Sequence, residues 1–427
     1  MNIKIKNATL VTNNDKNDVI RNGELHISEG LISYAGSASG APEFAPEKVV
    51  DAKGNAVMPG FFNMHTHIPM NMFRSYADDL TLMDWLNTRI FPAEDKLTAE
   101  MTYWASMAAL IEMAKAGIAG FNEMYFHVDA ICRAALQSGL RAIVTRAVVT
   151  PAEGVGERML GESVELFEKY NGQGRIKIYF APHAQYTVNN AMLEKIAETA
   201  KSYKTGVHMH ISETQGEHEA CIEEHGKTPI GLSADMGLLD VPFLAAHCVW
   251  VSDEDMDIMA QKGASVLSCP RSNLKLGSGV ARLADMLDRD VHVTFGTDGA
   301  ASNNKLSVMD EMTYGCLLQK GMTHDASVLP APRALKMATL NGAQAMGVNS
   351  GVLEKGRNAD IIILDISGMR YVPDYDVLSN IVYAGSDADV TMNIVGGDIL
   401  FENGGVTFAD EEEVKARLLE YAGMYRE

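Results

Sequence analysis

The chain has few of the features that mark membrane-bound or secreted proteins. Its 427 residues include only five cysteines, which are widely spaced and never form a C-x-x-C pair: Cys132, Cys221, Cys248, Cys269 and Cys316. Neither a disulfide framework nor a cysteine-rich zinc site is therefore expected. No apolar run approaches the roughly 18 residues that a membrane-spanning helix needs. The opening MNIKIKNATLVTNNDKN lacks the apolar segment of a signal peptide. We therefore expect a cytoplasmic protein with no membrane partner.

Positive charge is also scarce. The chain carries 36 Lys and Arg against 56 Asp and Glu, a net charge of −20, and its basic residues form no cluster. Such a chain repels the phosphate backbone, so we expect no nucleic-acid partner. The acidity is typical of a soluble protein.

Short apolar runs recur through the middle of the chain, with helix-like stretches between most of them. The eight runs span residues 55–67, 117–125, 141–149, 175–184, 205–213, 242–250, 264–270 and 291–299. Alternating strand and helix patterns predict a parallel sheet, and eight such units predict a (β/α)8 TIM barrel. An open doubly wound sheet is less favoured because no G-x-G-x-x-G loop follows the first run.

The two ends of the chain have a different pattern. Residues 1–55 and 346–427 contain short alternating segments separated by Asn, Asp and Gly, which predict antiparallel strands. Neither end has enough strands for a stable sheet of its own. We therefore expect both ends to form one small composite β-sandwich domain beside a hydrolase barrel at 56–345. A helix is expected within the last stretch, 409–427.

Two histidines one residue apart end the first run, in FFNMHTH. On a strand, His65 and His67 point to the same face, at the carboxyl end where barrel active sites are built. Later runs end in further polar side chains: His208, His210, Glu213, His247 and Asp298. Three imidazoles and a carboxylate suit Zn²⁺ or another borderline divalent ion. By spacing alone, either histidine of the fifth run could be the ligand.

The ordered set H-x-H, H-x-x-E, a histidine after the sixth run and an aspartate after the eighth resembles the amidohydrolase superfamily over almost the whole chain. The resemblance includes the closing segment GVLEKGRNADIIILD. Within the superfamily, several stretches are similar to the 5′-methylthioadenosine/S-adenosylhomocysteine deaminases. They are MHTHIPMNMFRSYADDLTLMDWL, FPAE, HISET, AHCVWVSDED, CPRSNLKLGSG and GTDGAASNNKLSVMDEM.

This resemblance implies a role for each residue at the strand ends. The metal ligands would be His65, His67, His210 and Asp298. His210 is chosen over His208 because Glu213 follows it by three residues, as in the family motif. Glu213 would carry a proton from the hydrolytic water to the ring nitrogen and the leaving amine. His247 would orient that water, and Asp298 could also accept a hydrogen bond from it.

The resemblance also implies one divalent ion, Zn²⁺ before Fe²⁺, Mn²⁺ or Ni²⁺. Binuclear relatives carry a carboxylated lysine on the fourth strand. Here that strand ends in His183, and Lys177 comes too early. A dihydroorotase- or hydantoinase-like protein is therefore disfavoured.

Further residues match substrate contacts of the family. Glu94 would bind ribose hydroxyls, His183 would touch the purine, and Arg146 would pair with a substrate carboxylate. Trp85 would line the pocket or pack beneath it, and Arg158 would assist Arg146. Gln185 stands where relatives commonly carry proline, so the preference for base and 5′ substituent stays open.

The sequence thus predicts hydrolytic deamination of adenosine-type nucleosides to the inosyl product and ammonia. The expected substrates are S-adenosylhomocysteine, 5′-methylthioadenosine, adenosine and 5′-deoxyadenosine. One alternative is an aminohydrolase of guanine, a pterin, a pyrimidine or a triazine. Another is a non-catalytic binding protein on the same barrel, which the complete set of site residues disfavours. The family also suggests a homo-oligomer.

Overall fold

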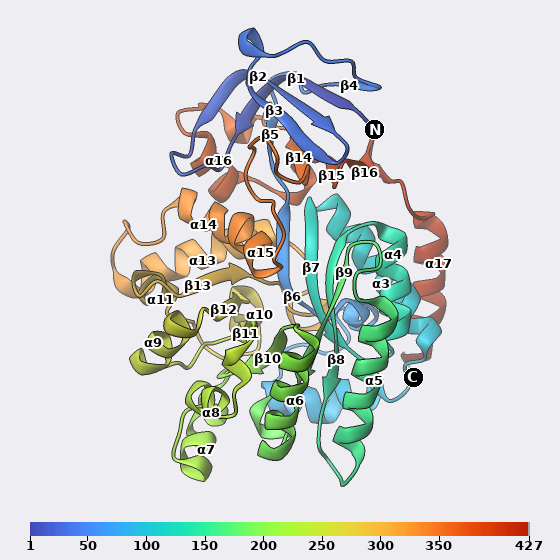
Figure 1. Ribbon diagram of the computed structural model, residues 1–427, viewed down its shortest axis with the longest axis vertical. Coiled ribbons are helices and arrows are strands. Elements are labelled where there is room, and N and C mark those ends of the chain that lie inside the picture. Colours follow the sequence, from blue (N-terminus) through green and yellow to red (C-terminus); the bar gives the residue numbers. More distant parts are fainter. Residues whose placement is uncertain (426–427) are drawn as a thin grey trace.

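A computed structural model describes residues 1–425, and these form two sheets wrapped by helices (Figure 1). One sheet is the barrel at the centre of the view, and the other lies at its upper end. None of the helices in the described chain combines the length and apolar character needed to cross a bilayer.

The eight predicted runs each contribute one barrel strand, which confirms the predicted barrel. The strands are β6 (Phe61–Thr66), β7 (Ile118–Tyr125), β8 (Arg141–Val148), β9 (Ile176–Pro182), β10 (Val207–Ile211), β11 (Phe243–His247), β12 (Ser265–Ser268) and β13 (His292–Phe295). Neighbouring strands run parallel from β6 through to β13. Almost all their residues are buried, as expected for strands covered on both sides.

The seam between the first and last strands is closed by side-chain and backbone hydrogen bonds. The Asn63 amide nitrogen donates to Thr297 Oγ1 at 2.7 Å, and its oxygen accepts from the Thr297 backbone N–H at 2.9 Å. The His65 carbonyl accepts from the backbone N–H groups of Thr297 and Asp298 at 3.1 and 2.9 Å. These bonds bring the carboxyl ends of β6 and β13 to one point.

Capped helices surround the barrel, and polar residues start many of them. Thr98, Asn189, Thr214 and Ser252 each accept a backbone N–H from the first turn of the helix that follows. The principal helices are α3 (Ala99–Lys115), α4 (Val128–Ser138), α5 (Val155–Tyr170), α6 (Asn190–Tyr203), α7 (Gln215–His225), α8 (Pro229–Asp235), α9 (Asp253–Lys262), α10 (Pro270–Lys275), α11 (Leu283–Asp288), α13 (Val308–Thr323), α14 (Ala331–Ala338) and α15 (Leu340–Ala345).

Strands from both chain ends form the second sheet, which has nine strands in the described chain. They are β1 (Ile3–Val11), β2 (Val19–Ser28), β3 (Leu31–Ser37), β4 (Lys48–Asp51), β5 (Ala56–Pro59), β14 (Ile361–Leu364), β15 (Val390–Val395), β16 (Asp398–Glu402) and β17 (Gly405–Val406). The two ends meet where β5 pairs with both β1 and β14. The first apolar run therefore divides at Gly60 into a strand of this sheet and a strand of the barrel.

Two later helices pack against the barrel. The helix α16 (Val377–Ala384) lies beside α14, and α17 (Glu411–Ala422) runs along α3 (Figure 1). Lys115 of α3 bonds Glu411 of α17 at 2.5 Å. The predicted C-terminal helix is thus present, and the last two positions of its predicted stretch, 426–427, lie outside the described residues.

A buried ion pair joins the two sheets. Both carboxylate oxygens of Asp360, whose side chain is 0% exposed, accept from the Arg141 guanidinium at 2.8 and 2.9 Å. Replacing Asp360 with asparagine leaves the Arg141 charge buried without its partner. We expect this to lower the free energy of unfolding by about 3 kcal/mol, measured by urea titration.

The matched control is Asp398→Asn. Asp398 pairs with Arg175, but its side chain is 68% exposed, so the loss is expected to stay below about 1 kcal/mol. Equal losses for the two variants would contradict a special role for the Asp360 pair.

Candidate active site

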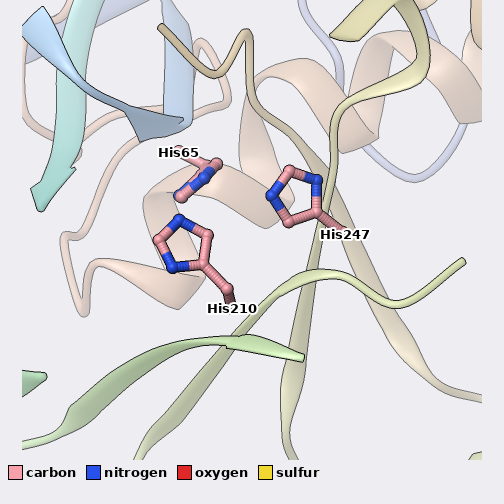
Figure 2. Close-up of side chains that lie close together, drawn as sticks. All are labelled: His65, His210 and His247. Carbon is pink, nitrogen blue, oxygen red and sulfur yellow. The ribbon is translucent and has the colours of Figure 1, made fainter. Parts of the chain in front are cut away.

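A hollow opens at the carboxyl ends of the barrel strands. Figure 2 shows the rings of His65, His210 and His247 turned toward one another from three different strands. The wall also includes His67, Asp298, Glu213, Glu94, His183 and Trp85. The barrel thus brings together residues that lie far apart in the sequence.

The imidazoles of His67 and His210 are oriented by backbone carbonyls. Nδ1–H of His67 donates to the Met124 carbonyl at 2.6 Å, and Nδ1–H of His210 donates to the His183 carbonyl at 2.9 Å. Their Nε2 atoms, left free of protons in the neutral rings, lie 3.2 Å apart. Burial lowers the pKa of both histidines, which favours the neutral form that binds metals.

His65 lies deepest in the cluster. Its side chain is fully buried, and its Nε2 atom has no hydrogen-bond partner among the described residues. Its Nδ1 atom lies 3.0 Å from Nε2 of His208, and Asn122 donates to the other nitrogen of His208 at 3.2 Å. Burial lowers the pKa of His65 to about 3. His208 therefore packs behind His65 and does not reach the centre.

Asp298 completes the cluster from the loop after β13. One carboxylate oxygen lies 3.5 Å from Nε2 of His65 and 3.2 Å from Nε2 of His67. The other accepts hydroxyl hydrogen bonds from Ser272 at 2.6 Å and Ser302 at 2.8 Å. Burial acts to raise the pKa of Asp298, but the nearby imidazoles of His65, His67 and His247 hold it well below its ordinary value.

Two overlapping sets of side chains could each hold a metal ion. His65, His210 and His247 place one nitrogen each within 4.8 Å of one another, and so do the ligand atoms of His65, His67 and Asp298. Both sets share His65, whose unpartnered Nε2 faces their common centre. Imidazole nitrogens with a single carboxylate are donors that a catalytic zinc ion favours, so the residues present fit such an ion.

Glu213 lies beside these candidate ligands, next to His247. Its carboxylate is 3.8 Å from Nε2 of His247 and accepts a hydrogen bond from the Ser278 hydroxyl at 3.2 Å. Burial raises the pKa of Glu213 to about 7, although His247 acts to lower it. Asn273 fixes the ring of His247 by accepting from Nδ1–H at 2.9 Å. A carboxyl group with such a pKa can both accept and donate a proton near neutrality.

The hollow is also lined by Glu94, His183 and Trp85. The Tyr125 hydroxyl donates to Glu94 at 2.5 Å, and burial raises the pKa of Glu94 to about 7. Nδ1 of His183 lies 3.0 Å from the Thr187 hydroxyl. The indole of Trp85 donates its N–H to the Ala77 carbonyl, and the Trp85 side chain lines the hollow.

Arg146 and Arg158 do not line this hollow. They lie in an adjoining one, where both pair with Glu162. Lys177 lines neither of these two hollows. Its ammonium group donates to the Met346 and Gly347 carbonyls at 2.7 and 3.1 Å.

Several residues that support the site were not identified in the sequence. Besides Asn122, Ser272, Asn273, Ser278 and Ser302, the buried Glu123 braces the chain on either side of His67. Its carboxyl bonds the Thr66 hydroxyl at 2.5 Å and the Ile68 N–H at 2.8 Å. Burial raises its pKa well above the ordinary value. The sequence offers one signal for the role of Glu123, which is its position near the end of the second apolar run.

Histidines and carboxylates that meet at the carboxyl ends of the strands of a (β/α)8 barrel are typical of the active sites of metal-dependent barrel hydrolases. This chain belongs to the amidohydrolase family, whose model matches residues 56–400. It is 42% identical over 421 residues to a 5-methylthioadenosine/S-adenosylhomocysteine deaminase of Moorella thermoacetica, covering 97% of this chain and 98% of the relative. It is 41% identical over 415 residues to a 5′-deoxyadenosine deaminase of Methanosarcina acetivorans, covering 96% and 95%.

The fold also matches a solved relative throughout. An adenosine deaminase of Xanthomonas campestris with bound zinc superposes with a TM-score of 0.96 at 31% identity, covering 99% of this chain and 98% of that one.

Proposed function

We propose that the protein is a metal-dependent deaminase that converts adenosine-type nucleosides and water to the inosyl product and ammonia. The observation that carries this proposal is Glu213, a buried carboxyl with a pKa of about 7 beside the histidine cluster. The relatives named as deaminases of 5-methylthioadenosine, S-adenosylhomocysteine and 5′-deoxyadenosine support the same substrate class.

We propose that one divalent ion, Zn²⁺ first, is held by His65, His67, His210 and Asp298. The free Nε2 atoms and the seated carboxylate of Asp298 support this set, and zinc in the solved relative supports the choice of ion. Such an ion supplies Lewis acidity, which makes water acidic enough to lose a proton near neutral pH.

The chain's own residues then move the protons. Glu213 takes a proton from the water as its oxygen adds to C6 of the purine, and passes it to the ring nitrogen N1. The hydroxyl now on C6 loses its proton, which Glu213 passes to the amino group; the bond between C6 and the amino nitrogen breaks, the C6 carbonyl forms, and ammonia leaves. His247, held by Asn273, orients the attacking water, and Asp298 accepts a hydrogen bond from it.

Glu94, His183 and Trp85 would position the nucleoside. Glu94 lines the same hollow as the cluster and can accept from two neighbouring ribose hydroxyls. His183 would contact the purine, and Trp85 would form part of the apolar wall. A free base would lack the contact with Glu94.

We also propose that the protein acts in the cytoplasm as a homo-oligomer. All five cysteines are buried and unpaired, which suits a reducing compartment. Exposed apolar side chains on the adjacent helices α13 and α16, such as Leu317 and Tyr383, offer surface for a second copy.

The test is ammonia release from the purified, zinc-loaded protein. S-adenosylhomocysteine, 5′-methylthioadenosine, adenosine, adenine and guanine are supplied in parallel, with the absorbance change of adenine-to-hypoxanthine conversion as a second readout. We expect turnover of the nucleosides and none of the free bases, because only nucleosides carry the ribose that Glu94 would bind. Turnover of guanine alone, or no turnover of any of the five, would refute the proposal.

A further inference from the structure

A second hollow adjoins the active site. Phe126 lines both hollows, so its ring is a shared wall. Three cationic and three anionic side chains surround the second hollow: Arg146, Arg158, Lys169, Asp129, Glu162 and Glu165. The positive and negative charges around this hollow therefore balance, and Arg146 and Arg158 are both engaged in ion pairs.

Glu162 of α5 occupies both arginines. Nε of Arg146 lies 3.1 Å from one carboxylate oxygen, and a terminal nitrogen of Arg158 lies 2.5 Å from the other. The Arg146 side chain is only 11% exposed, lies against the Phe126 ring and donates to the Ala147 carbonyl at 2.6 Å. Arg146 is thus held just behind two residues of the active-site wall, Phe126 and Ala147.

The active-site hollow itself has no Lys or Arg for a negatively charged substrate group within residues 1–425, and it contains the carboxylates Glu94, Glu213 and Asp298. Its lining also includes the apolar side chains of Leu82, Leu86 and Phe91. A carboxylate on the substrate would have to displace Glu162 from Arg146 before it gained an ion pair.

We propose that Glu162 is a specificity determinant that keeps Arg146 and Arg158 from the substrate and thereby favours nucleosides with an uncharged 5′ substituent over those with an amino-acid tail. This inference rests on the proposed deaminase function and deepens it. The favoured class includes 5′-deoxyadenosine and 5′-methylthioadenosine, and the disfavoured class includes S-adenosylhomocysteine.

The experiment compares the wild-type protein with Glu162→Gln. It measures kcat/KM for 5′-methylthioadenosine, S-adenosylhomocysteine and an analogue whose 5′-thioether carries a carboxyethyl group without the amine. The wild type should favour 5′-methylthioadenosine. In Glu162→Gln, the ratio of kcat/KM for each carboxylate substrate to that for 5′-methylthioadenosine should rise roughly tenfold, because a guanidinium is released.

The matched control is Glu165→Gln. Glu165 lies one turn of α5 away, lines the same hollow and makes no ion pair among the described residues, so its ratio should stay at the wild-type value. An unchanged ratio in Glu162→Gln, or a wild type that prefers S-adenosylhomocysteine, would overturn the inference. A ratio that rises for the carboxyethyl analogue but falls for S-adenosylhomocysteine would also overturn it, because Glu162 would then bind the substrate ammonium. Inactivity of the wild type on all three would instead refute the proposed function.

Discussion

Replacing Glu213 with glutamine should abolish most turnover and leave the metal in place. Glutamine has nearly the same shape and can still contact Ser278, but it cannot accept the proton from water or return it to the purine. General acid–base catalysis typically contributes about 10²- to 10⁴-fold, so kcat with 5′-methylthioadenosine should fall by that factor. Metal content, measured by elemental analysis of the same preparation, should match the wild type.

The control for this change is Glu219→Gln on α7, the helix that follows Glu213 in the chain. Glu219 is an exposed residue that accepts a hydrogen bond from Gln215 at 2.7 Å, away from the hollow. Its kcat should equal that of the wild type. Full activity of Glu213→Gln would remove Glu213 from the proton transfer, and loss of the metal would show that it acts as a ligand.

Replacing Asp298 with asparagine should cost the protein its metal. The carboxylate supplies the negative charge of the proposed ligand set, and its second oxygen is seated by Ser272 and Ser302. Losing an outer partner of a ligand typically lowers metal affinity by about 10- to 100-fold, so losing the charged ligand itself should exceed that range. Zinc affinity by chelator competition measures the change, and ammonia release should fall with it.

Ser302→Ala is the matched comparison. It removes one of the two hydroxyls that hold Asp298 and keeps the carboxylate, so its loss of zinc affinity should lie within the outer-partner range. Asp298→Asn with full zinc affinity would exclude Asp298 from the ligands.

The barrel could be predicted because its signals are local. Each strand is a short apolar run, and polar residues at the end of a run stand at the catalytic edge of a parallel barrel. The division of the first run at Gly60, by contrast, could not be predicted from local signals. The segments β5 and β6 are equally apolar, and only pairing of β5 with β1 and β14 assigns it to the second sheet. Such long-range pairing leaves no trace in local periodicity.

The same limit applies to the site. The histidines and carboxylates could be found because their chemistry is distinctive, whereas Asn122 and Ser272 are ordinary polar residues until the fold places them against His208 and Asp298. Arg146 is expected to meet the substrate because it matches a substrate contact of the family. Its partner Glu162 belongs to a following helix whose charged face looks like any solvated surface.

The seam between β6 and β13 gives the site a dependence on folding order. Asn63 and Thr297 are 234 residues apart, and their hydrogen bonds place His65 and Asp298 on either side of the same joint. A chain still emerging from the ribosome has the first two histidines early but lacks Asp298 until nearly the whole barrel has been made. With the proposed ligand set, tight zinc binding would require the last strand to dock on the first, so an unfinished chain would not form the reactive centre before the barrel encloses it.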